Sequence, residues 1–238
     1  VQIIKCLLDI SDCILDTFDS RSCSLRQFSN LRSNHRKPFS LFPGSQNEQR
    51  SLKPLEKKVI EDFGCGRFIF CSDAGLASEN NRILNHSRDR AFIVTQPIKK
   101  LSAEYRELAL NRKRFRRLSD HKLVDLDHLT DDDSDQLFYK EEPYSSKKLE
   151  QRLIITYSPK YAAYQKEIRQ KQVERAMAML KAGNHTKQRK NPNDPARFIT
   201  KEAVTQDGER AEIQYYLDET KIAEESLYDG LYAVCTDL

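Results

Sequence analysis

The stretch FIFCSDAGLASENN, residues 68–81, joins an apolar run to an acid, a small turn and the start of a helix. The run Arg67–Cys71 predicts a strand buried on both faces, as in a parallel sheet. Ser78 is a suitable N-cap for a helix over residues 79–86. Asp73 therefore stands where a core strand reaches the surface, and open α/β sheets place their chemistry at that end of their strands.

The residues on either side of this stretch extend the pattern. Ser51 can cap a helix whose apolar residues recur at helical spacing, and Gly64 supplies its stop. The run AFIVTQ, residues 91–96, predicts the next strand. Helix, strand, helix and strand then alternate, which favours an α/β layer with parallel strands.

Further elements follow after a charged region. The run RLIITYS predicts a strand over residues 152–158, and Ser158-Pro159 opens a long helix that ends at Gly183-Asn184. A partial apolar stripe runs along this helix, formed by Tyr161, Tyr164, Ile168, Ala176, Met179 and Leu180. The last elements expected are a hairpin turning at residues 206–208, a helix over 218–226 and a strand formed by LYAVCT, residues 231–236.

Composition sets limits on the class of protein. The 238 residues carry a formal charge of +4, which is weak support for a polyanionic partner. The six cysteines form no CxxC pair and no zinc-ligand spacing, so we expect reduced thiols in a cytoplasmic, nucleoid-associated protein. No apolar run has the ~20 residues needed to span a bilayer, and we expect no membrane partner. With 7 glycines and no phosphate-binding loop, nucleotide hydrolysis is not expected.

The residues alone leave the role of Asp73 open. It can cap the turn that follows it, or it can ligate a metal ion above the sheet. A metal site would need further acids, because Mg²⁺ takes several oxygen ligands.

Five blocks in order resemble bacterial insertion-sequence DDE transposases. Besides residues 68–81, they are LFPGSQNEQRSLKPLEKKV (41–59), FIVTQPIKKLSAEYRE (92–107), TYSPKYAAYQKEIRQKQVERA (156–176) and EESLYDGLYAVCT (224–236). The resemblance covers residues 39–238 and is weakest over 111–150.

The resemblance implies a fold and a chemistry. The fold is α/β: a ribonuclease H-like mixed sheet with flanking helices, interrupted by a mixed strand and helix insertion. In this family two Asp and one Glu bind two Mg²⁺ (or Mn²⁺) ions and drive strand cleavage and joining at transposon ends, and Asp73 matches the second Asp. Two metals about 3.5–4 Å apart would activate the nucleophile and stabilise the leaving oxygen. The implied partner is double-stranded DNA, with a homodimer acting on paired ends.

The other two acids have no matching positions in this sequence. Residues 1–38 do not resemble the strand that carries the first Asp, and Asp9, Asp12, Asp16 and Asp19 are assigned no role. The Glu belongs to a helix beyond the strand that LYAVCT resembles. We therefore expect an internal or degenerate piece of a transposase, inactive alone.

The resemblance also implies a division of the chain. We expect an irregular N-terminal segment (1–38), half of a ribonuclease H-like core (39–110), a charged connection (111–150), an insertion lobe (151–226) and a returning core strand (227–238).

Two basic groups are candidate DNA ligands. The first lies in NRKRFRRLSDHK, with Phe115 as a stacking or anchoring residue, and a solvated charged segment balanced by Asp131–Asp133 is the alternative. The second lies on the long helix, where an ordinary surface helix is the alternative. The residues are Arg112, Lys113, Arg114, Arg116 and Arg117, and Lys160, Arg169 and Arg175.

Three functions are compatible with the sequence. The first is a DDE transposase, the second a non-catalytic DNA-binding remnant of one, and the third a free-standing nuclease on the same fold. The five histidines are scattered and predict no nucleophilic triad. Asp229 is interpreted as a turn-forming residue with Gly230, with a second metal-site acid as the alternative.

Overall fold

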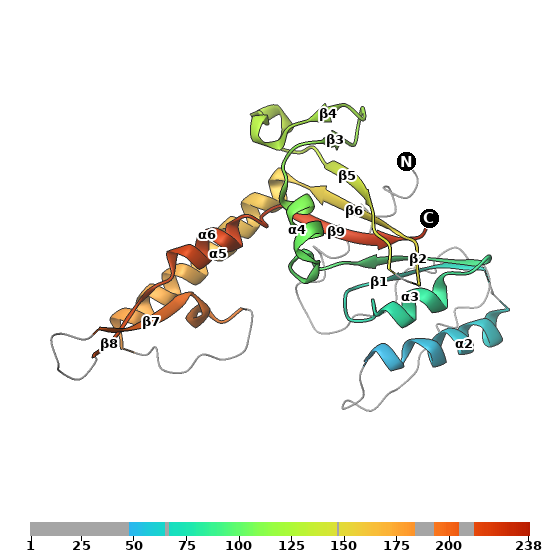
Figure 1. Ribbon diagram of the computed structural model, residues 1–238, viewed down its shortest axis with the longest axis horizontal. Helices are drawn as coiled ribbons and strands as arrows, with labels where there is room; N and C mark the ends of the chain where they lie inside the picture. Colours follow the sequence, from blue (N-terminus) through green and yellow to red (C-terminus); the bar gives the residue numbers. More distant parts are fainter. Residues whose placement is uncertain (1–47, 65–66, 147, 184–192, 205–211) are drawn as a thin grey trace.

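The structure, a computed structural model, describes residues 48–64, 67–146, 148–183, 193–204 and 212–238 (Figure 1). Its helices are α2 (Leu52–Phe63), α3 (Glu79–Asn85), α4 (Ala103–Leu110), α5 (Pro159–Lys181) and α6 (Glu219–Ser226). Its strands are β1 (Phe68–Ser72), β2 (Arg90–Thr95), β3 (Phe115–Arg117), β4 (Leu123–Val124), β5 (Phe138–Pro143), β6 (Arg152–Tyr157), β7 (Ile199–Val204), β8 (Glu212–Leu217) and β9 (Leu231–Thr236). Short 3-10 helices span Glu48–Arg50, Ile98–Lys100, Leu126–His128, Asp131–Asp133 and Pro195–Phe198.

Seven of these strands form one mixed sheet in the order β1-β2-β9-β6-β5-β3-β4, and β7 and β8 form a separate hairpin. β1 and β2 are parallel, with Phe70 opposite Phe92. All the other neighbours are antiparallel, so β9 lies between β2 and β6 and runs against both. The prediction of an α/β fold with a mixed sheet and a parallel β1–β2 pair is confirmed.

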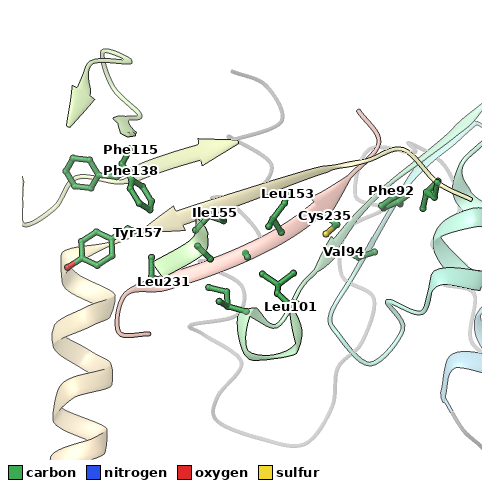
Figure 2. Close-up of a cluster of buried hydrophobic side chains, with 14 of the residues drawn as sticks. Phe92, Val94, Leu101, Phe115, Phe138, Leu153, Ile155, Tyr157, Leu231 and Cys235 are labelled. Carbon is green, nitrogen blue, oxygen red and sulfur yellow. The ribbon is translucent and has the colours of Figure 1, made fainter. Parts of the chain in front are cut away.

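The main core covers one face of this sheet. Alternate residues of β2, β9 and β6 point into it, among them Phe92, Leu153 and Cys235 (Figure 2). Leu52 of α2 and Ala109 of α4 belong to the same cluster, so helices cover that face. A smaller cluster on the opposite face contains Ile93, Ile154 and Val234.

Local capping residues mark most helix boundaries as the sequence predicted, whereas Ser51 precedes α2 without a side-chain capping hydrogen bond. Gly64 ends α2 with a positive φ of 61°, which glycine adopts without steric cost. Ser78 caps α3, where its hydroxyl accepts a hydrogen bond from the amide of Asn81. Ser158 caps α5 in the same way, with Pro159 in the first turn. The helix over residues 218–226 and the strands over 91–96, 152–158 and 231–236 are also confirmed within a residue or two.

Two expectations about the sheet differ from the structure. β1 is not buried on both faces, because Ile69 is 49% exposed and Cys71 is exposed; β1 is the edge strand of the described sheet. Residues 111–150 are not merely a connection, since β3, β4 and β5 lie there and belong to the sheet. The segments 1–38 and 39–47 and the hairpin turn at 206–208 lie outside the described residues.

α5 extends away from the sheet, and β7, β8 and α6 lie along it (Figure 1). Phe198 and Ile199 pack with Val173 and Ala176 of α5 in a separate apolar cluster. β6 precedes α5 and is a central strand of the main sheet, so this lobe begins at residue 159 rather than at 151.

The N-terminal half of α5 is held against the turn before β9 by hydrogen bonds. The guanidinium of Arg169 donates to both carboxylate oxygens of Asp229 at 2.5 and 2.6 Å, and both side chains are largely buried. The side chain of Gln165 accepts from the amide of Gly230 at 2.7 Å, and Ser158 donates its amide to the carbonyl of Gly230 at 3.0 Å. We call these contacts the α5–β9 junction, and they set the direction in which α5 leaves the sheet.

Candidate functional site

Asp73 follows the last residue of β1, and its side chain is exposed. Its Oδ1 accepts a hydrogen bond from the amide of Gly75 at 2.9 Å, so it caps the turn as one of the two interpretations expected. That contact leaves Oδ2 unused by the turn. The position at the carboxyl end of a parallel strand is therefore compatible with both interpretations.

The end of β2 lies beside the end of β1, which Asp73 follows. Thr95, the last residue of β2, pairs with Val234 in the middle of β9, and the first residues of β9 extend beyond β2. The hydroxyls of Thr95 and Tyr232 there lie 2.5 Å apart. Burial, above all, raises the pKa of Tyr232, although the hydrogen bond with Thr95 opposes this rise, and Tyr161 and the negative charge of Asp73 add to it. Asp73 follows the end of β1, Thr95 ends β2, Tyr232 is the second residue of β9, and Tyr161 lies in the first turn of α5. We call these four residues the Asp73 edge.

The loop between Asp73 and α3 is held by two buried side chains of α3. The amide group of Asn81 donates to the carbonyl of Leu76 at 2.9 Å, and Nε of Arg82 donates to the carbonyl of Ala77 at 3.0 Å. Arg82 also donates to the side chains of Gln96 and Gln151 at 2.7 and 3.1 Å. The same guanidinium thus connects the Asp73 loop with the segments that follow β2 and precede β6.

The described residues do not form a metal site. Nowhere in the described ranges do three or more His, Cys, Asp or Glu side chains gather so that they could hold a metal ion. Asp73 alone is too few ligands for Mg²⁺, which needs several oxygens. Asp229 is not a second metal acid, because Arg169 occupies both of its carboxylate oxygens. Asp9, Asp12, Asp16 and Asp19 lie outside the described residues.

The basic segment 112–117 lies far from the Asp73 edge. Four strands separate β3 from β1, which corresponds to roughly 24 Å at about 4.8 Å per strand. Arg112 pairs with Asp127 at 3.0 Å, and Arg117 pairs with Asp133 at 2.8 Å. These two arginines support the surrounding loops.

The remaining residues of this segment divide into exposed cations and a buried ring. Phe115 is fully buried, so the expectation that it stacks on a nucleic acid base is wrong. Lys113, Arg114 and Arg116 are exposed. Only these three of the five predicted cations are therefore placed to meet a phosphate backbone.

A buried lysine attaches this segment to the sheet. Lys140 of β5 is 6% exposed, and its Nζ donates to the carbonyls of Leu108 and Asn111, at the end of α4, at 2.5 and 2.6 Å. The ammonium lies 4.4 Å from the centre of the Phe115 ring. Burial lowers the pKa of Lys140 from 10.5 to about 8.

The lowered pKa of Lys140 predicts that the free energy of unfolding increases at alkaline pH. Between pH 8 and 10.5 the unfolded chain holds a proton on Lys140 that the folded chain has released, so folding becomes more favourable as the pH rises. From pH 8 to pH 10 we expect a gain of at most about 2 kcal/mol, because Lys140 is already half deprotonated in the folded chain at pH 8 and solvent screens part of the effect. Urea denaturation at pH 8 and pH 10 measures it, and Lys140→Met, which cannot titrate, should lose this contribution. An identical pH dependence in both proteins would contradict the prediction.

The three predicted DNA ligands of α5 do not share one surface. Lys160 and Arg175 are exposed, whereas Arg169 lies on the buried side and is bound to Asp229. The guanidinium of Arg169 is thus engaged by a carboxylate of the same chain. The residues of the predicted apolar stripe also lie on different sides of α5. Ala176 is buried in the lobe, whereas Tyr164 and Ile168 are 45% and 40% exposed.

The aromatic component of the Asp73 edge was not predicted from the sequence. Tyr161 and Tyr164 fit the pattern of a buried stripe, and Tyr232 fits that of a core strand. In the structure Tyr161 and Tyr164 stack on each other with ring centroids 6.4 Å apart. Their spacing of three residues within a lysine- and arginine-rich helix was the available signal.

Comparisons of the chain with models of known protein families, with curated proteins and with solved structures found no match. Within the described part of the chain, no helix combines the length and the apolar character required to cross a bilayer.

Proposed function

We propose that this chain is part of a DDE-type DNA transposase with a ribonuclease H-like core, in which Asp73 is one of the carboxylates of the reaction centre. The observation that carries the proposal is the place of Asp73: it is exposed at the carboxyl end of β1, which is parallel to β2. A rigid strand fixes the backbone there and lets the carboxylate face solvent. Supporting it are the five ordered blocks of sequence that resemble this family.

The proposal extends to the cofactor, but the described residues supply only part of its site. Mg²⁺ or Mn²⁺ would need carboxylates in addition to Asp73, and the described residues gather none into a metal-binding group. When bound, such ions would activate the attacking oxygen and stabilise the leaving oxygen. We therefore assign Asp73 to the proposed reaction centre and attribute no catalytic step to this residue alone.

The partner in this proposal is double-stranded DNA at transposon ends, with a homodimer holding two ends. Support comes from the exposed cations Lys160 and Arg175 on α5, the helix that begins beside the Asp73 edge. Lys113, Arg114 and Arg116 form a second exposed group at the far end of the sheet. Cations of this kind bind the phosphate backbone regardless of sequence.

Fluorescence anisotropy with a labelled duplex tests DNA binding. For about three phosphate contacts, we expect the Kd to rise roughly 40-fold between 50 and 200 mM salt, because binding releases condensed counterions. Lys160→Gln should weaken binding and reduce the salt dependence, whereas Lys166→Gln, an exposed lysine elsewhere on α5, should change neither substantially. A Kd that ignores salt would contradict the proposal.

A second function, a DNA-binding remnant without catalysis, is favoured by the lack of a metal-binding group in the described residues. The two functions differ in strand cleavage. We expect the chain alone to leave a transposon-end duplex intact with Mg²⁺ or Mn²⁺. Cleavage that Asp73→Asn abolishes would favour the complete enzyme instead.

A further inference from the structure

One exposed face of α5 combines tyrosines with cations. Tyr161, Tyr164 and Ile168 follow each other at intervals of three and four residues, which places them on one side of a helix. The rings of Tyr161 and Tyr164 stack at an interplanar angle of 20°, and the side chain of Tyr164 is 45% exposed. We call Tyr161, Tyr164 and Ile168 with Lys160 and Arg175 the tyrosine–cation face.

Both ends of this face carry a positive charge. Lys160 precedes the tyrosines and Arg175 lies two turns beyond Ile168, and both are exposed. Lys171 lies between them and is paired with Glu167 at 2.6 Å. Lys160 and Arg175 thus remain available for an anionic partner that runs along the helix.

The face begins at the Asp73 edge. α5 starts directly after β6, whose last residue pairs with the first residue of β9 (Figure 1). Tyr161 lies in the first turn of α5, and the hydroxyl of Tyr232 near the start of β9 lies 2.5 Å from that of Thr95, which ends β2 beside the strand that Asp73 follows. A ligand lying on the tyrosines would therefore extend toward Asp73.

The chemistry of the face selects its ligand. An apolar protein partner would cover Tyr164 and Ile168 but would leave Lys160 and Arg175 without counter-charges. A DNA duplex would satisfy the cations, but its bases are stacked inside the helix and cannot reach the rings. Unpaired nucleotides satisfy both groups, because phosphates meet the cations and an exposed base stacks on an aromatic ring.

We propose that the tyrosine–cation face of α5 binds unpaired DNA nucleotides next to the phosphodiester that faces Asp73. The inference rests on the proposed function and adds the form of its substrate: DNA that is single-stranded or opened beside the reacting phosphate. Tyr164 supplies the stacking surface, Tyr161 supports its ring from behind, and Lys160 and Arg175 bind the flanking phosphates.

Binding of an oligothymidylate and of a duplex of equal length to the full chain tests this proposal. Tyr164→Ala should weaken binding of the single strand about tenfold, within the range of one lost base stack. Tyr164→Phe keeps the ring and should bind normally. Duplex affinity should change less than twofold in both variants, and Tyr164 is exposed enough for both to fold, which thermal denaturation checks.

A second readout is intrinsic to the protein. The chain has no tryptophan, so its emission comes from its 10 tyrosines. The oligothymidylate should quench part of this emission in the wild type and less of it in Tyr164→Ala. If the single strand binds equally well to wild type and Tyr164→Ala while duplex binding stays salt-dependent, this inference fails and the proposed function stands. If neither DNA binds, both fail.

Discussion

Asp229→Ala is expected to lower the free energy of unfolding by about 3 kcal/mol. The substitution removes the carboxylate that the two terminal nitrogens of the Arg169 guanidinium contact at 2.5 and 2.6 Å. The side chain of Arg169 is only 12% exposed, so its charge would remain in a poorly solvated position. Urea denaturation at neutral pH measures the loss.

A surface pair on the same helix provides the control. Glu167 contacts Lys171 at 2.6 Å, but these side chains are 64% and 59% exposed. Glu167→Ala should cost much less than Asp229→Ala, because water screens exposed ion pairs. Adding Arg169→Met to Asp229→Ala should recover part of the loss by removing the uncompensated charge. Equal costs for Asp229→Ala and Glu167→Ala would show that the junction does not depend on this pair.

Gly230→Ala is the second substitution with a large expected effect, roughly 2–4 kcal/mol. Gly230 has a φ of +77°, which side chains with a Cβ rarely adopt. An added Cβ would lie 2.6 Å from the Tyr157 ring, 2.8 Å from the Cβ of Ala162 and 2.8 Å from the carbonyl oxygen of Ser158. The first turn of α5 would have to move away from β9 to accommodate the added Cβ.

Gly183→Ala separates the two causes of that loss. Gly183 also has a positive φ, +67°, but an added Cβ meets nothing within 4 Å. Its cost should be only about 1 kcal/mol, the backbone contribution alone. Thermal denaturation of the two variants side by side makes the comparison. A Gly230→Ala protein as stable as Gly183→Ala would mean that the close contacts at the junction are not rigid.

The sequence predicted best the elements whose boundaries depend on local chemistry. Gly64, Ser78 and the Ser158-Pro159 pair mark helix ends through their own backbone and side-chain hydrogen bonds. The apolar runs that became β2, β6 and β9 were recognisable because the centre of a sheet is buried on both faces. These features belong to a few consecutive residues.

The strands between residues 111 and 150 could not be predicted in that way. Phe115 and Phe138 are fully buried, but Phe115 lies among arginines and lysines in the sequence, and Phe138 lies in a stretch rich in acidic residues. β3 has three residues and β4 two, and both depend on pairing with strands elsewhere in the chain. Their position became apparent only from the sheet as a whole.

The candidate site also depends on contacts between residues that are far apart in the sequence. The composition of α5 indicated possible DNA ligands, but it could not distinguish Arg169, which binds Asp229, from Lys160 and Arg175, which face solvent. The partner of Arg169 lies 60 residues away in the sequence. Similarly, Asp73 was recognisable as the residue after a strand, whereas its neighbour Tyr232 comes from the opposite end of the described chain.

The central claim is that the Asp73 edge faces DNA, and cleavage by a tethered reagent tests it most directly. An iron chelate attached to Asp73→Cys, in a chain whose six native cysteines are replaced, generates hydroxyl radicals at that edge. The same chelate on Lys57→Cys, an exposed position of α2, is the control. We predict that bound DNA is cut from position 73 over a few adjacent nucleotides and remains intact from position 57. Bound DNA that is not cut from position 73, or is cut equally from both, would contradict the account.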